Sequence, residues 1–96
     1  YLRVLGSFAR LHAADARRLR NAVEAMDRRA LRNLAHKLRG ASGSIGAHAV
    51  ADTAIVLDDA LRDPQLDGAI LQPMALATAD ALEQLVTDLR HIGIGR

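Results

Sequence analysis

His36 lies in the part of the sequence whose residue types and spacing best suit chemistry, because Arg39, Gly40 and Gly43 follow it closely. A neutral imidazole is nucleophilic near physiological pH, and a phosphoryl group bound to it stays reactive enough to pass to a carboxylate. Phosphoryl transfer depends mainly on positioning and charge neutralisation. An accessible ring nitrogen with a cation nearby meets those needs, and Arg39 supplies the cation.

Helical spacing predicts that these side chains share one exposed surface. At about 100° per residue, His36 lies about 200° from both Leu34 and Leu38, opposite the apolar stripe. Gly40 and Gly43 follow four and seven residues later, along the same outward face. A glycine inside a helix costs about 1 kcal/mol relative to alanine. We interpret the two glycines as clearance that lets another protein approach His36.

Four stretches of the chain must position these residues, since each shows the three- and four-residue apolar spacing of an amphipathic helix. The expected helices cover about Leu2–Ala25, Arg28–Ser44, Ala47–Leu61 and Ile70–His91. Asp27 is a suitable N-cap for the second helix and Gly46 a suitable terminator. Pro73 is tolerable only in the first turn of the last helix. The pattern favours an all-α fold, an antiparallel up-down four-helix bundle, with residues 1–96 as a single domain.

The composition agrees with an all-α fold and excludes several other classes. Half of the residues are hydrophobic, with one Phe, one Tyr and no Trp. The absence of cysteine excludes a disulfide framework and a thiolate metal site. No apolar run approaches the roughly 20 residues that span a bilayer, and no signal-peptide pattern opens the chain. We expect a cytoplasmic domain without membrane contact, cut from a longer protein because no Met precedes Tyr1.

The formal net charge of +2 hides an uneven distribution. Residues 1–46 contain ten Lys or Arg and three acidic residues, whereas residues 47–96 contain three Arg and eight acidic residues. A basic half beside an acidic half suggests a partner with an acidic or phosphate-bearing surface.

The other histidines have structural interpretations. His12 falls on the inner stripe of the first expected helix and is predicted to be a partly buried core residue. His48 begins the third helix, and His91 ends the fourth, where a cation suits the helix dipole. No two of the four histidines stand at i, i+4 spacing with carboxylate support, so we expect neither a metal site nor a cofactor.

The segment from His36 to Ala47 resembles the signature of histidine-phosphotransfer (HPt) domains. That signature is a His followed by Leu-Lys-Gly and a Gly ten residues after the His; here Leu38-Arg39-Gly40 and Gly46 match it. The similarity is strongest over about residues 23–61. The resemblance implies a helical bundle whose second helix exposes a phosphorylatable His. It also implies a carrier without kinase activity of its own, which shuttles phosphoryl groups between receiver-domain aspartates in two-component signalling.

The resemblance also assigns roles to individual residues. His36 would be the phosphoacceptor, and Lys37, Gly40 and Gly43 would belong to the docking surface for the receiver. Arg39 would stabilise the phosphoryl group where the family usually has Lys, with a planar fork in place of a compact ammonium. The resemblance is compatible with a domain of a hybrid sensor histidine kinase and with a free-standing phosphotransfer protein, and the missing Met favours the hybrid kinase.

Three other classes fit parts of the sequence. A nucleic-acid-binding helical domain would explain the basic first half, but aromatic residues for base stacking are lacking. The dimerising phosphoacceptor domain of a sensor kinase usually has an acidic residue directly after the His and a Pro a few residues on, whereas Lys37 and Gly40 occupy that stretch. A purely structural bundle would not need two glycines on an outward face. We expect receiver domains as partners and no nucleic acid.

Overall fold

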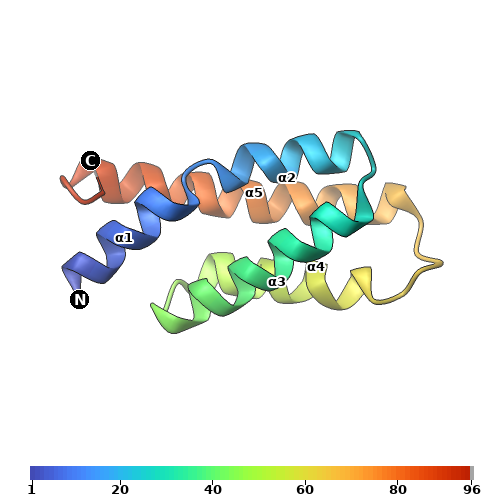
Figure 1. Ribbon diagram of the computed structural model, residues 1–96, viewed down its shortest axis with the longest axis horizontal. Helices are drawn as coiled ribbons and strands as arrows, with labels where there is room; N and C mark the ends of the chain where they lie inside the picture. Colours follow the sequence, from blue (N-terminus) through green and yellow to red (C-terminus); the bar gives the residue numbers. More distant parts are fainter. Residues whose placement is uncertain (96) are drawn as a thin grey trace.

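The computed structural model describes residues 1–95, which are all helical apart from short connections (Figure 1). The all-α class is confirmed. The helices are α1 (Leu2–His12), α2 (Asp15–Glu24), α3 (Arg28–Ser44), α4 (His48–Leu61) and α5 (Gly68–His91).

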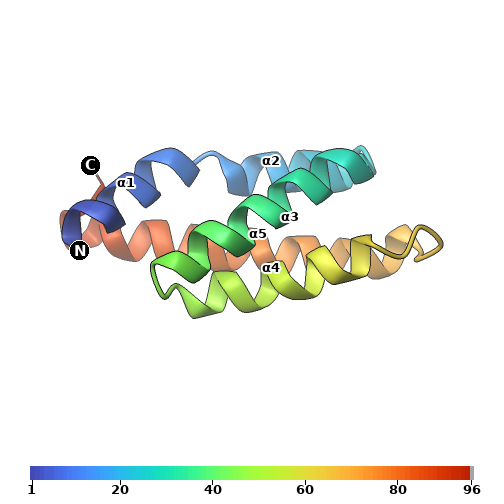
Figure 2. The ribbon, with the colours of Figure 1, turned by 60° about the horizontal axis from the view of Figure 1, so that its bottom comes forward.

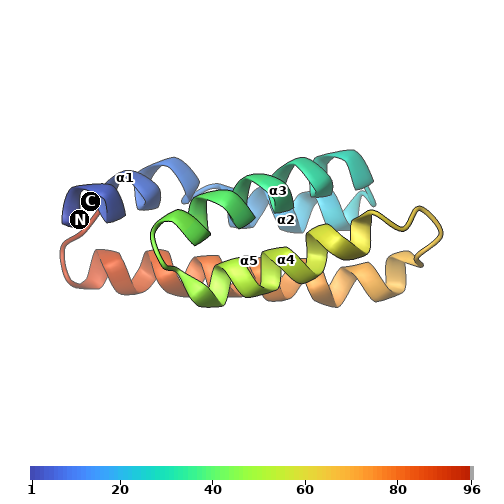
Figure 3. The same cartoon turned by 90° about the horizontal axis from the view of Figure 1, so that it is seen from below.

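Helices α2 to α5 form the predicted four-helix bundle. Helix α2 packs against α3 and α5, and α4 packs against the same two helices on the other side. Successive helices run in opposite directions, so the up-down antiparallel topology is confirmed (Figure 2). Viewed from below, α2 and α3 lie in one layer and α4 and α5 in the other (Figure 3). Helix α1 continues beyond the bundle and contacts the end of α5.

The first expected helix, Leu2–Ala25, is wrong as a continuous element. The chain leaves the helix after His12 and re-enters it at Asp15, with Ala13 and Ala14 between. Because alanine is the strongest helix former, local propensity contains no sign of this break. The break coincides with a buried contact between His12 and Asp15, which depends on tertiary packing.

The ends of α3 are determined locally, as the sequence predicts. The Asp27 carboxylate accepts a hydrogen bond from the Ala30 amide at 3.1 Å and caps the first turn. Gly46 adopts a left-handed conformation with φ +74° after the last turn. The Ala47 amide then donates to the Ser42 carbonyl at 2.9 Å, as in a Schellman motif. Both ends hold α3 in register, so its outward residues are determined as well.

Helix α5 begins earlier than expected, at Gly68, where the Asp67 side chain accepts a hydrogen bond from the Ala69 amide at 3.0 Å. Pro73 therefore lies in the second turn of α5 and not in the first. The helix continues past it, and the carbonyl that loses its usual donor belongs to the exposed Ala69.

The core is built mainly from leucine and alanine. Its largest fully buried side chains include leucines from four helices: Leu19, Leu31, Leu38, Leu57, Leu71 and Leu82. All of them lie on the predicted apolar stripes. Within residues 1–95, no helix combines the length and the apolar character required to cross a membrane.

Candidate functional site

The imidazole of His36 projects from the exposed face of α3, as predicted. Its side chain is 78 % exposed, while Leu34, Ala35 and Leu38 on either side are buried in the core. Packing of those three residues determines the rotation of α3 about its axis. His36 is therefore held in solvent by the burial of its neighbours.

Asp58 on α4 places its carboxyl group within ion-pair distance of the His36 ring. His36 Nδ1 lies 3.5 Å from Asp58 Oδ2, and the Asp58 side chain is only 7 % exposed. The sequence analysis missed this residue because 22 positions separate the pair. One signal was present in the sequence: Asp58 follows Ala54 by four residues and therefore lies beside the inner stripe of α4.

Arg39 and Arg62 both reach the carboxylate of Asp58. Arg39 Nη1 lies 3.3 Å from Asp58 Oδ2 and 3.3 Å from Asp59 Oδ1. Arg62 Nη2 lies 3.7 Å from Asp58 Oδ2. The Arg39 charge is therefore shared between two carboxylates in the resting chain. Arg39 and His36 are linked by Asp58, because both side chains approach the same carboxylate oxygen.

Gly40 and Gly43 face open space. A Cβ atom added at either position would meet no atom within 4 Å outside the local helix backbone. A neighbouring helix therefore does not explain why these two positions lack side chains. They leave a strip of bare backbone on α3 directly after His36.

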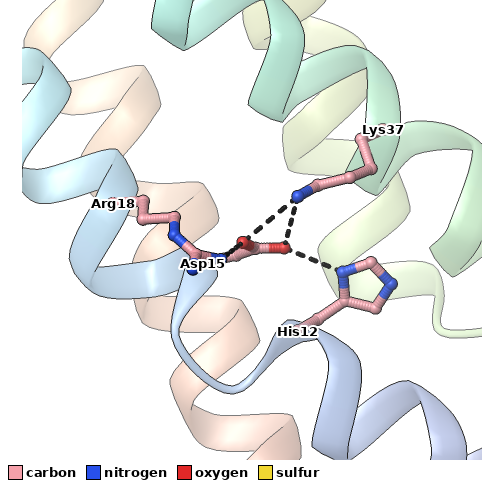
Figure 4. Close-up of polar contacts among 4 residues, drawn as sticks. All are labelled: His12, Asp15, Arg18 and Lys37. Carbon is pink, nitrogen blue, oxygen red and sulfur yellow. Dashed lines mark hydrogen bonds and ion pairs between the residues drawn. The ribbon is translucent and has the colours of Figure 1, made fainter.

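Lys37 points away from this face, toward a buried polar cluster at the break between α1 and α2 (Figure 4). Its Nζ lies 3.1 Å from Oδ2 of Asp15, whose side chain is fully buried. His12 Nδ1 lies 2.8 Å from the same oxygen, and Arg18 Nη1 donates to Oδ1 at 2.8 Å. Lys37 therefore fastens α3 to the α1–α2 break. His12 is a buried residue, as predicted.

The contacts of Asp15 set the direction of its pKa shift. Burial alone would raise the pKa of Asp15, but the hydrogen bonds from His12, Arg18 and Lys37 together hold it below its ordinary value. A carboxyl whose folded-state pKa is lowered stabilises the fold above its unfolded-state pKa. That contribution disappears as the pH falls through the folded-state pKa.

We therefore expect Asp15→Asn to lower the free energy of unfolding at neutral pH by about 1–3 kcal/mol, since an amide replaces a buried ion and its charge-assisted hydrogen bonds. The difference between parent and variant is expected to shrink as the pH falls below about 4, where the unfolded-state carboxyl becomes protonated. Urea unfolding of both proteins at several pH values measures this difference in the free energy of unfolding. A difference that stays constant down to acidic pH would contradict the lowered pKa.

The fold brings four of the predicted site residues to one face, namely His36, Arg39, Gly40 and Gly43, and turns Lys37 toward α2. It adds Asp58 and Asp59 from α4. The arrangement presents a nucleophilic ring in solvent, a buried carboxylate at one of its nitrogens and a guanidinium close by.

Comparison with known proteins gives one match. A family model described as the Hpt domain matches residues 3–92 of the 96-residue chain. No curated protein and no solved structure matches the sequence significantly.

Proposed function

The chain belongs to the Hpt family of histidine-phosphotransfer domains, and from that premise we propose that His36 accepts a phosphoryl group from a receiver-domain aspartate and passes it to another receiver. Domains of this family carry out histidine phosphotransfer in phosphorelays. The observation that supports His36 most directly is its strongly exposed ring beside two glycines that open to solvent. A partner's active site can approach such a ring over the bare backbone at Gly40 and Gly43.

The proposed chemistry needs one ring nitrogen as nucleophile. Nε2 attacks the phosphorus of the aspartyl phosphate, an N–P bond forms, and the P–O bond to the departing carboxylate breaks. In the onward step, a carboxylate oxygen of the second receiver attacks the phosphorus and the N–P bond breaks. The imidazole keeps the proton on Nδ1 throughout.

Asp58 is well placed to support that role of Nδ1. A carboxylate 3.5 Å from Nδ1 favours the ring form that carries its proton there, which leaves the Nε2 lone pair for the phosphorus. It also stabilises the positive charge that the ring gains when Nε2 becomes bonded. We propose that Asp58 is a positioning residue of the transfer, and that Arg39 compensates the phosphoryl charge nearby.

The chain acts in this proposal as a carrier without kinase activity of its own. In-line transfer needs positioning and charge neutralisation, and the receiver supplies the metal ion and the second reacting group. Lys37 does not face the partner in this proposal. It supports the surface around His36 by linking α3 to α2 through its hydrogen bond to Asp15.

The test is incubation of the chain with receiver domains that carry a labelled aspartyl phosphate. We expect label on the chain that is acid-labile and stable in alkali, as a phosphoimidazole is. In the same assay, Asp58→Ala is expected to slow labelling while the fold is retained, and nitrogen NMR is expected to show more of the Nε2–H ring form. An acid-stable label would indicate a hydroxyl ester and would remove the proposal.

A further inference from the structure

One face of α3 changes character at His36. Arg32 and Arg29 precede His36 by four and seven residues, and Gly40 and Gly43 follow it by four and seven. At 1.5 Å rise per residue these positions lie about 6 and about 10 Å from His36 along the helix axis, in the two directions. His36 thus separates an arginine half of the face from a bare half.

The arginine half borders a groove between α3 and α4. The groove has a volume of about 1160 Å³ and contains His36 in its wall. We call it the cationic groove, because its charged lining is Arg28, Arg29, Arg32, Lys37, Arg62 and, as the one carboxylate, Asp58.

Most cations of this groove already have partners within the chain. Arg28 donates to the backbone carbonyls of Asp63 at 2.7 Å and Leu66 at 3.0 Å, which closes the α4–α5 connection. Lys37 is paired with Asp15, and Arg62 lies near Asp58. These three side chains have structural tasks.

Arg29 and Arg32 differ from them. Both are exposed, and neither forms a hydrogen bond or ion pair with any residue in the described range 1–95. Arg29 also lies in the first turn of α3, which contains no acidic residue. The positive end of a helix dipole disfavours a cation there. Two unpaired cations, one of them at the helix end that disfavours a positive charge, therefore have no evident role in the fold.

We propose that Arg29 and Arg32 bind an acidic segment of the receiver domain that docks on His36. The inference rests on the proposed function and adds the chemistry of the partner. Carboxylates of a partner would neutralise the two guanidinium groups, whose fork geometry suits that contact. The bare half at Gly40 and Gly43 would take the closely packed part of the same partner. Because the arginine half and the bare half lie at opposite ends of this face, they determine the direction in which a receiver lies along α3.

The experiment compares the parent with the double variant Arg29→Gln/Arg32→Gln, using a phosphorylated receiver domain that labels the parent. We expect the second-order rate constant of transfer to fall about tenfold at low ionic strength, because charge complementarity acts mainly on association. The parent is expected to slow as salt is added, and the variant to lose most of that dependence. Labelling by phosphoramidate, which needs no docked protein, is expected to be the same for both.

Arg17→Gln is the matched control. Arg17 is also exposed and unpaired within residues 1–95, but it lies on α2, and we expect no change in rate or salt dependence. A double variant with the parent's rate and salt dependence would overturn the docking role while leaving His36 as the acceptor. If no phosphorylated receiver labels the parent chain, the proposed function itself is wrong, whatever the double variant does. If the parent binds RNA in a salt-dependent way and the double variant does not, the proposal that the partner is an acidic protein segment is wrong.

Discussion

Replacing His36 with glutamine is expected to abolish phosphoryl labelling by receiver domains and to leave the bundle intact. Glutamine keeps a polar side chain of similar reach but has no nucleophilic ring nitrogen, so no N–P bond can form. Because the His36 side chain is 78 % exposed and its Nδ1 lies 3.5 Å from Asp58 Oδ2, its packing contribution is small. We expect the free energy of unfolding to change by no more than about 0.5 kcal/mol.

Two other histidines provide matched controls. His48 and His91 are also exposed, at the start of α4 and the end of α5. His48→Gln and His91→Gln are expected to keep full labelling. Circular dichroism and the thermal midpoint establish that each variant is folded. Label that persists in His36→Gln, or that moves to another histidine, would show that the acceptor has been assigned wrongly.

Gly40→Gln is expected to separate stability from transfer. A Cβ atom added at Gly40 meets no atom within 4 Å outside the local helix backbone, and both alanine and glutamine suit a helix interior better than glycine. We therefore expect a thermal midpoint equal to or above that of the parent, with Gly40→Ala more stable by about 0.5–1 kcal/mol. Transfer to a receiver is expected to fall at least tenfold, because the longer side chain occupies the space that a docked partner needs.

The direction of the stability change identifies the role of the glycine. Gly46 is the matched contrast, since its φ of +74° disfavours any side chain. Gly46→Ala is expected to destabilise the bundle by about 1 kcal/mol, whereas Gly40→Ala stabilises it. Phosphoramidate is expected to label Gly40→Gln as well as the parent. A destabilised Gly40→Gln, or one with unimpaired transfer, would contradict the interpretation of Gly40 as clearance for a partner.

The local features of α3 could be predicted from the residues alone. Asp27 and Gly46 cap its two ends, and the apolar residues Leu31, Leu34 and Leu38 define one buried stripe. Those features are local, because a cap acts on neighbouring amides and a 3.6-residue period determines which side faces a core. The outward direction of His36 and of the two glycines follows from them without knowledge of the partner helices.

Other features depended on which helices pack together. Alanine at positions 13 and 14 shows no sign of a helix break, which accompanies the buried contact of His12 with Asp15. The contacts of His36 with Asp58 and of Lys37 with Asp15 join residues 22 positions apart in both cases. The same packing pairs Arg39 with acidic side chains of α4 and leaves Arg29 and Arg32 unpaired within residues 1–95. Helical periodicity shows which side of a helix is buried, but pairing across helices depends on their contact distance and relative register, which only the packed bundle determines.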